Sequence, residues 1–188
     1  KLHGADCRIF ADRIVAGTYL FGCIATGGEV LLEDAPWEQM SAVLLTAKRL
    51  GSRCTLTEEG IYVQSPERPE LSGTLRTAIY PGFPTDLQSA ALVAMLKGDG
   101  SCIVEETIFE NRFRIVEELI EMGADIEVLS TRAVRITGVE KLYAKTMRAC
   151  ELRGGAALVL AGLMANGESR VDGCSFIYRG YENICRDL

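Results

Sequence analysis

The chain has 188 residues, of which 48% are apolar, so it is long enough to bury a hydrophobic core. Its formal charge of −6 and isoelectric point near 5.0 argue against a nucleic-acid-binding protein, and its apolar stretches are too short to span a membrane. The seven cysteines form no C-x-x-C pair and there is one histidine, which indicates reduced thiols of a cytoplasmic protein and argues against a disulfide framework or a metal site.

The first part of the chain has the pattern helix, strand, helix, hairpin. Residues 14–27 predict a helix that is apolar on nearly every side, which is typical of a buried helix. A strand over residues 28–35 follows, and residues 40–51 predict a second, amphipathic helix on the surface. Residues 53–64 alternate as in a β-hairpin, with the turn near Glu59–Gly60.

The same order of elements follows in the second part. Residues 86–98 predict another buried helix, and residues 100–108 predict a strand. Residues 111–123 predict a surface helix, because their apolar side chains recur with the spacing of one helix face. Residues 125–136 predict a second hairpin, with its turn near Ser130–Arg132.

A third part begins in the same way. Residues 154–167 predict a buried helix, residues 167–177 a strand, and residues 180–188 the start of a surface helix.

The spacing of glycines indicates that these parts are repeats. Gly28 and Gly100, at the first turn, lie 72 positions apart, and so do Gly51 and Gly123, at the end of the second helix. Each is suited to end a helix, because glycine adopts positive φ at little cost. Two unrelated landmarks with one offset predict a repeated unit.

We therefore expect a mixed α/β (α+β) fold, an inside-out α/β barrel that forms a single domain over residues 1–188. Its three pseudo-threefold repeats would cover residues ~8–66, ~74–140 and ~145–188. The apolar helix of each repeat would lie inside a shell of short sheets. The third repeat lacks the rest of its second helix and its hairpin, so we expect the natural protein to be longer.

Five motifs in order carry a resemblance to a known family. Together they resemble the enolpyruvyl transferase family, in the branch of UDP-N-acetylglucosamine 1-carboxyvinyltransferases. The motifs are DRIVAGTYL at residues 12–20, PGFPTDLQ at 81–88, FENRF at 109–113, ELRGGAALVLAG at 151–162 and RGYE at 179–182.

The resemblance implies a function. Such an enzyme transfers the enolpyruvyl group of phosphoenolpyruvate to the 3-hydroxyl of UDP-N-acetylglucosamine, the first committed step of peptidoglycan synthesis, without a cofactor. The family has two inside-out domains with the active site between them. This chain would be part of the C-terminal half. The missing catalytic domain carries the catalytic cysteine, so we expect this chain alone to be inactive.

The resemblance also implies site residues. Asp86 would bind the sugar hydroxyl and take its proton, and Ile108 would touch the UDP-sugar through its backbone. The residues themselves allow plainer interpretations, because Asp86 could simply stabilise a helix start and Ile108 could be a core strand residue. Glu151 stands where the family usually has Asp, and we assign it no catalytic role.

Three arginines complete the candidate substrate site. Arg153 and Arg179 would hold the phosphate or carboxylate of phosphoenolpyruvate through paired hydrogen bonds, and Arg112 is a weaker candidate. Each could instead be a solvated surface charge, and Arg112 could form a structural contact with Glu110 or with a backbone carbonyl.

Two other functions stay open on the sequence. The sister branch of the family acts on shikimate 3-phosphate with the same fold and reaction. A stand-alone, non-catalytic repeat domain that binds a ligand or partner is the third possibility. FENRF and RGYE together favour the nucleotide-sugar branch.

Overall fold

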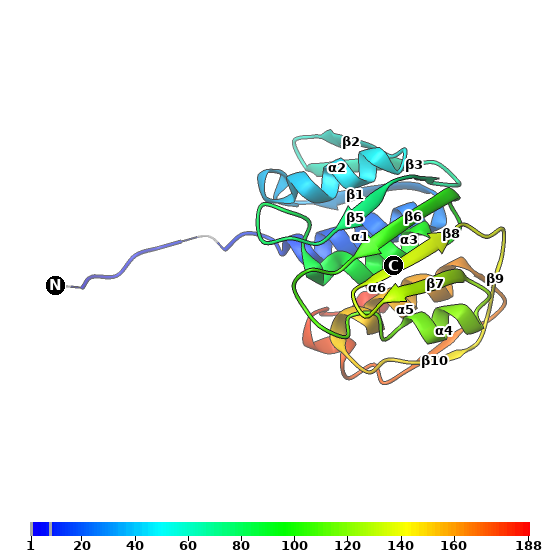
Figure 1. The fold of residues 1–188 in the computed structure, drawn as a ribbon. Helices are drawn as coiled ribbons and strands as arrows, with labels where there is room; N and C mark the ends of the chain where they lie inside the picture. The colour runs from blue at the N-terminus through cyan, green and yellow to red at the C-terminus, as the bar shows by residue number, and fades with distance from the viewer. Residues whose placement is uncertain (1, 8) are drawn as a thin grey trace.

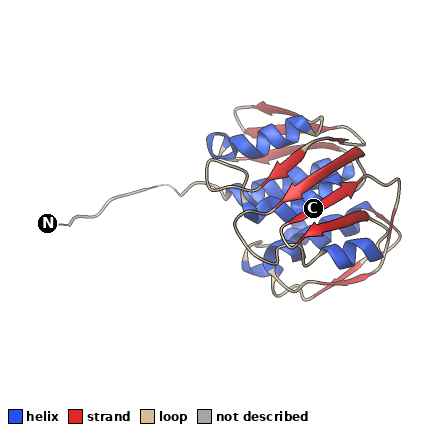
Figure 2. Ribbon diagram, in the orientation of Figure 1, coloured by secondary structure: helices blue, strands red, loops and turns tan. Residues whose placement is uncertain are grey.

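Three apolar helices form the interior of the protein. The computed structural model describes residues 2–7 and 9–188, and in it these helices lie in mutual contact with strands around them (Figures 1 and 2). They are α1 (Arg13–Thr26), α3 (Gln88–Met95) and α5 (Leu152–Met164). All 8 residues of α3 are buried, as the absence of a polar face predicts.

Small residues allow these helices to pack closely. A Cβ atom at Gly17 of α1 would overlap the side chain of Leu87, and one at Gly22 would lie 3.1 Å from Leu160 Cδ2. Ala90 and Ala91 of α3 are likewise buried against their neighbours. Bulky side chains at these positions would push the helices apart.

The first sheet is antiparallel and has three strands. Its order is β1 (Gly28–Glu33), β3 (Gly60–Ser65), β2 (Arg53–Leu56), so the hairpin predicted over residues 53–64 is present. The surface helix α2 (Ser41–Arg49) follows the short 3₁₀ helix η1 (Trp37–Met40).

The second sheet has five strands. Its order is β4 (Glu70–Leu71), β6 (Asp99–Glu105), β8 (Ala133–Thr137), β7 (Asp125–Ser130), with β5 (Thr74–Arg76) also paired to β6. The predicted second hairpin is β7–β8, and its register shifts between Val128 and Ser130. Helix α4 (Val116–Glu121) covers the surface here and contacts β7.

The last part of the chain forms two short parallel strand pairs. They are β9 (Leu142–Tyr143) with β11 (Ala165–Asn166), and β10 (Thr146–Arg148) with β12 (Arg170–Asp172). The 3₁₀ helix η3 (Ile177–Arg179) and the four-residue helix α6 (Ile184–Asp187) follow.

The structure corrects three expectations. The strands in the described part of the chain form separate sheets and no closed barrel, because the ladders of the third part are two short pairs. The second surface helix begins at Val116, five positions after the expected start. Asn111 has a positive φ of 54°, which keeps it out of the helix, and residues 112–115 form turns. Strands β4, β5, β9 and β10 were not expected.

None of the helices that the structure describes has the length and apolar character needed to cross a bilayer.

We predict that the helix core dominates stability. Phe21 is fully buried on α1 and packs edge to face against Phe83, with ring centroids 5.9 Å apart. Phe21→Ala leaves a cavity in this core and should lower the free energy of unfolding by about 3–5 kcal/mol in urea denaturation. Leu45→Ala is the control, because that side chain is 61% exposed and its loss should change stability by less than about 0.5 kcal/mol. Similar losses in the two variants would contradict this account.

Candidate substrate site

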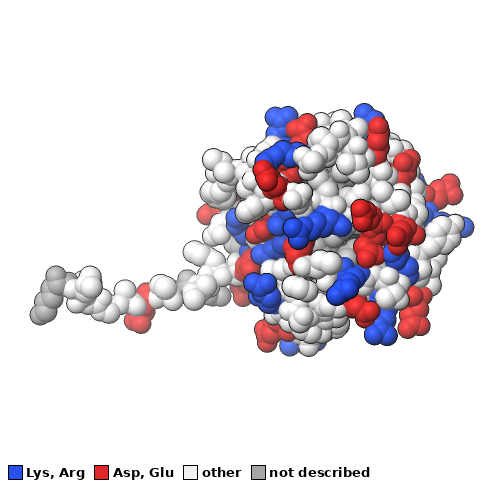
Figure 3. Space-filling view, turned by 60° about the horizontal axis from the view of Figure 1, so that its bottom comes forward, with Lys and Arg blue, Asp and Glu red and all other residues white. Residues whose placement is uncertain are grey.

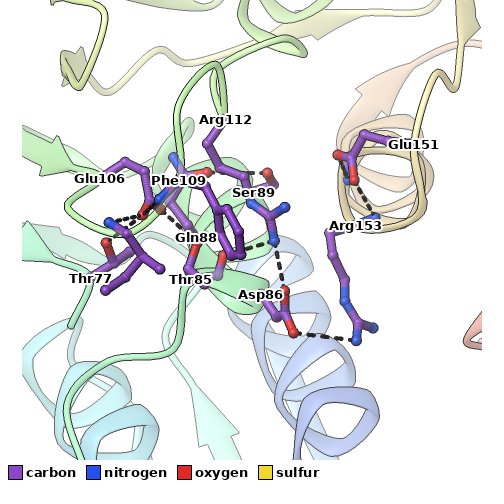
Figure 4. A network of polar contacts seen from close by, with 12 residues as sticks. Thr77, Thr85, Asp86, Gln88, Ser89, Glu106, Phe109, Arg112, Glu151 and Arg153 are labelled. Atoms are coloured by element: carbon purple, nitrogen blue, oxygen red, sulfur yellow. Dashed lines mark hydrogen bonds and ion pairs between the residues drawn. The ribbon is translucent and has the colours of Figure 1, made fainter. Parts of the chain in front are cut away.

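An aspartate and two arginines meet at one end of the helix core. Asp86 lies in the 3₁₀ turn η2 (Thr85–Leu87) that leads into α3, and Arg153 lies in the first turn of α5. Arg112 Nη2 donates to Asp86 Oδ1 at 2.8 Å, and Arg153 Nη2 lies 3.6 Å from Asp86 Oδ2 (Figure 4). The structure thus brings together three of the five residues expected in the site.

This cluster has spare capacity for an anion. The carboxylate side chain is 41% exposed, whereas the side chains of Arg112 and Arg153 are only 16% and 17% exposed. Arg112 Nε and Arg153 Nη1 are buried and have no partner among the described residues. Buried donors are normally paired, so both nitrogens are available to a bound acceptor. One carboxylate between two guanidinium groups also leaves a net positive charge, which favours phosphate or carboxylate ligands.

Arg112 is fixed from two further sides. Its Nη2 donates to the Thr85 carbonyl oxygen at 3.3 Å, and its guanidinium carbon lies 5.5 Å from the ring centroid of Phe109. These contacts hold the planar group against Asp86. Of the two structural alternatives for Arg112, the contact with a backbone carbonyl is present at Thr85. The ion pair with Glu110 is not formed, and Glu110 lies 3.5 Å from Arg132 instead.

A buried glutamate that the sequence did not indicate organises the loops around the cluster. Glu106 is 1% exposed and accepts hydrogen bonds from four donors. The donors are Thr77 Oγ1 at 2.9 Å, Thr85 Oγ1 at 2.8 Å, Ile108 N at 2.7 Å and Phe109 N at 3.0 Å (Figure 4). A single carboxylate therefore ties the residue before Asp86 to the loop that carries Arg112.

Ile108 lies at a small pocket beside Asp86. The pocket holds about 160 Å³, and Arg13, Tyr80 and Thr85 also line it. The Arg13 guanidinium carbon stands 5.7 Å from the centroid of the Tyr80 ring. The Ile108 backbone N–H is already bonded to Glu106, and its side chain is 36% exposed.

Arg179 lies outside the cluster of Asp86, Arg112 and Arg153. It ends η3 with an exposed side chain that makes no ion pair or hydrogen bond with any residue the structure describes. Its neighbour Gly180 does pass close to the site, because a Cβ there would lie 3.5 Å from Arg153 Nη1.

Glu151 caps α5. Its carboxylate accepts a hydrogen bond from Arg153 N at 2.9 Å and another from Gly154 N. Asp12 caps α1 in the same way, accepting from Ile14 N at 2.7 Å. Glu151 therefore satisfies free N–H groups at the start of the helix that carries Arg153.

The cysteine thiols, possible metal ligands and surface charges of the described residues add no further candidate site. Burial raises the pKa values of the Cys23, Cys54 and Cys102 thiols, that of Cys54 to about 11, so these three stay protonated near neutral pH. No group of His, Cys, Asp and Glu within residues 2–7 and 9–188 could hold a metal ion. On the face shown in Figure 3, basic and acidic side chains lie intermingled, with no extended area of one sign.

Comparison with known proteins identifies the family. Residues 1–188 match the family model of EPSP synthase (3-phosphoshikimate 1-carboxyvinyltransferase). The chain belongs to this family of enolpyruvyl transferases. The family resemblance carried by the five sequence motifs is thereby confirmed.

Two curated relatives show how much of a longer protein this chain covers. The UDP-N-acetylglucosamine 1-carboxyvinyltransferase of Nitratidesulfovibrio vulgaris (strain DP4) is 42% identical over 185 residues, which are 98% of this chain and 44% of the relative. The protein of the same name from Halorhodospira halophila is 46% identical over 185 residues, 97% of this chain and 43% of the relative. The chain thus spans less than half the length of these relatives.

Solved structures agree on the fold. The enolpyruvyl transferase NikO from Streptomyces tendae superposes with a TM-score of 0.82 at 20% identity, over 97% of this chain and 43% of that one. EPSP synthase from Acinetobacter baumannii gives 0.66 at 17% identity, over 88% and 40% of the two chains.

We predict that Glu106 holds the site loops together. Glu106→Gln keeps the size of the side chain, but replaces one carboxylate oxygen with an amide nitrogen that cannot accept hydrogen bonds. The Thr77, Thr85 and backbone donors would then lose hydrogen bonds to a charged acceptor. The free energy of unfolding in urea should fall by about 1.5–3 kcal/mol. Glu110→Gln is the matched control, because this carboxylate is 82% exposed and its neutralisation should cost less than about 0.5 kcal/mol. Equal stability of the two variants would show that the Glu106 contacts contribute nothing net.

Proposed function

We propose that this chain is part of the C-terminal half of an enzyme that moves the enolpyruvyl group of phosphoenolpyruvate to the 3-hydroxyl of UDP-N-acetylglucosamine. Relatives at 42–46% identity carry that activity in their names. The observation that carries the proposal is the contact of Asp86 with Arg112 and Arg153 at one end of the helix core. The enzyme would work in the cytoplasm, in the first committed step of peptidoglycan synthesis.

The chemistry assigns a role to each residue. The sugar hydroxyl forms a C–O bond to the enol carbon, its proton leaves, and the bond from that carbon to the phosphate oxygen breaks. The ion pair with Arg112 requires an ionised Asp86, which is the form that can accept the hydroxyl proton. Arg153 and Arg179 would hold the phosphate or carboxylate of phosphoenolpyruvate, and Arg112 and Ile108 would contribute substrate contacts.

The proposed domain organisation rests on the repeated order of helices and strands. We propose a single domain of three similar units around a pseudo-threefold axis, with α1, α3 and α5 on the inside. The other half of the enzyme would close the cleft and supply the catalytic cysteine. On this proposal the chain alone binds substrates weakly and has no transferase activity.

The shikimate 3-phosphate branch is the second candidate, because the matching family model carries the name of that enzyme. Binding of UDP-N-acetylglucosamine and of shikimate 3-phosphate to the complete enzyme would separate the two branches. Binding of neither, with no turnover, would favour a non-catalytic repeat domain.

We predict that Asp86→Asn in the complete enzyme lowers kcat by about 10²–10⁴-fold, the range for general base catalysis. The amide keeps the size but cannot take the proton, so KM should change little. Asp99→Asn is the control, because this aspartate at the start of β6 is 68% exposed and pairs with Arg68. Phosphate release from the two substrates measures the rate. A change in KM alone would make Asp86 a positioning residue.

We predict a different signature for the arginines. Arg153→Ala or Arg179→Ala should weaken the use of phosphoenolpyruvate, measured as kcat/KM, by about 1.5–3 kcal/mol, the contribution of a charged hydrogen bond. Arg170→Ala is the control, because its side chain is 76% exposed and pairs with Asp172. An effect confined to UDP-sugar binding would contradict the anion-binding role.

A further inference from the structure

The RGYE motif, here called the RGYE segment, contains a tyrosine that the candidate site does not yet explain. The segment covers residues 179–182 and overlaps the end of η3. Arg179 is exposed, whereas Tyr181 is only 2% exposed. The Tyr181 ring belongs to a small hydrophobic cluster with Ala156 of α5 and Ile177 of η3. A tyrosine buried in this way normally has a hydrogen-bond partner for its hydroxyl.

The partner of the Tyr181 hydroxyl lies on another core helix. Tyr181 Oη lies 2.7 Å from Thr18 Oγ1 on α1. The Thr18 hydroxyl donates its one hydrogen to the Ile14 carbonyl oxygen at 2.9 Å, so Tyr181 is the donor in the bond between the two side chains. Thr18 is 1% exposed, so water cannot replace either partner of this bond without a rearrangement.

A glycine lets the RGYE segment lie against the start of α5. A Cβ atom at Gly180 would lie 3.0 Å from Leu152 Cδ1 and from Leu152 Cδ2, and 3.5 Å from Arg153 Nη1. No side chain therefore separates the backbone of the segment from the first turn of α5. Arg153 Nη1 is buried, and Gly180 is one of the residues that lie over it.

These contacts form a continuous path between the starts of the three core helices. Thr18 on α1 holds Tyr181. The residue before Tyr181, Gly180, lies against Arg153 on α5. Arg153 in turn lies 3.6 Å from Asp86, in the turn before α3 (Figure 4). A displacement of the RGYE segment would therefore reach the candidate substrate site through Arg153.

We propose that Tyr181 is a positioning residue for the binding of phosphoenolpyruvate. Its hydrogen bond to Thr18 fixes the RGYE segment, which in turn fixes the surroundings of Arg153 and the backbone of Arg179. Because Tyr181 is buried, it acts through these two arginines and does not touch the substrate. A guanidinium group holds a phosphate or carboxylate by two parallel hydrogen bonds only when its plane is correctly oriented, so a small shift weakens anion binding. The inference rests on the proposed function in naming phosphoenolpyruvate as the anion.

A neighbouring hydroxyl provides a matched control. Tyr19 follows Thr18 on α1, and its hydroxyl donates to Asp187 Oδ2 at 2.9 Å. Its ring stands edge to face with that of Tyr181, with the centroids 6.4 Å apart. The Tyr19 hydroxyl thus joins α1 to the exposed side of α6 and makes no hydrogen bond with the RGYE segment. Tyr19→Phe and Tyr181→Phe are the same chemical change at adjacent rings.

Steady-state kinetics of the complete enzyme tests the role of the Tyr181 hydroxyl. Tyr181→Phe should raise the KM for phosphoenolpyruvate by about 3–10-fold, the effect of one lost hydrogen bond, while the KM for the acceptor substrate changes less than about twofold. Tyr19→Phe should change the KM for phosphoenolpyruvate by less than about twofold. A purely structural role would lower the folded fraction and so lower kcat at an unchanged KM. That result, or an equal rise of KM in both variants, would overturn the proposal.

Thr18 tests the same bond from its other end. Thr18→Val keeps the shape of the side chain but removes the acceptor, so it should raise the KM for phosphoenolpyruvate as Tyr181→Phe does. Thr18→Ser keeps the acceptor and should keep the KM of the unmodified enzyme. The combined variant Thr18→Val with Tyr181→Phe should show no larger rise than either change alone, because the same bond is lost in each. Effects that multiply in the combined variant would contradict the proposal.

Hydrogen exchange tests the anchoring of the segment independently of turnover. The Gly180 and Tyr181 amides donate to the Ile177 carbonyl oxygen at 3.1 Å and 3.2 Å. Exchange at these two positions should be at least about fivefold faster in Tyr181→Phe and unchanged in Tyr19→Phe. Unchanged exchange in Tyr181→Phe would overturn the anchoring.

The kinetic and exchange measurements separate this inference from the proposed function. Phosphoenolpyruvate is the donor in both candidate branches of the family, so the kinetic test can be made with either acceptor. An unmodified enzyme without turnover would refute the proposed function, and the exchange rates would still decide whether Tyr181 anchors the RGYE segment. Turnover with an unchanged KM in Tyr181→Phe would refute this inference alone.

Discussion

The close packing of α1, α3 and α5 is the constraint on which the rest of the structure depends. Glycine and alanine let the helices approach until a Cβ at Gly17 would strike Leu87. Because the helices begin at the same end, the starts of α3 and α5 lie side by side, and Asp86 comes within 3.6 Å of Arg153. The candidate site is therefore a consequence of the core and not a separate addition to it.

Capping and loop anchoring turn this juxtaposition into a defined geometry. Glu151 accepts hydrogen bonds from the free N–H groups at the start of the helix that carries Arg153. Glu106 accepts hydrogen bonds from Thr85, just before Asp86, and from the loop that carries Arg112. A buried carboxylate is costly unless its hydrogen bonds are complete, and Glu106 has four donors. Such a carboxylate holds nearby groups in place before any ligand arrives, which is what anion binding by guanidinium groups needs.

In the second and third units, a parallel strand pair joins the strand before the buried helix to the strand after it. Strand β5 precedes helix α3 and pairs in parallel with β6, which follows that helix. Strand β10 precedes helix α5 and pairs in parallel with β12 in the same way. These strands are only three residues long, so their stability comes from the neighbouring strand and from the helix between them. The unpaired edge of β1 is the one place where this arrangement is incomplete among the described residues.

The sequence by itself determined the buried helices, the two hairpins and the 72-residue offset, because all of these depend on local periodicity and on glycines that end helices. With the family motifs it also nominated Asp86, Arg112 and Arg153. Tertiary structure alone decided that Glu106 is a buried acceptor and that Arg112 pairs with Asp86 rather than with Glu110. It also left Arg179 in solvent and the sheets separate, where an inside-out α/β barrel was expected. The physical reason is distance along the chain. Arg112 and Asp86 are 26 positions apart, and β5 finds β6 across a whole helix, so no local pattern encodes either contact.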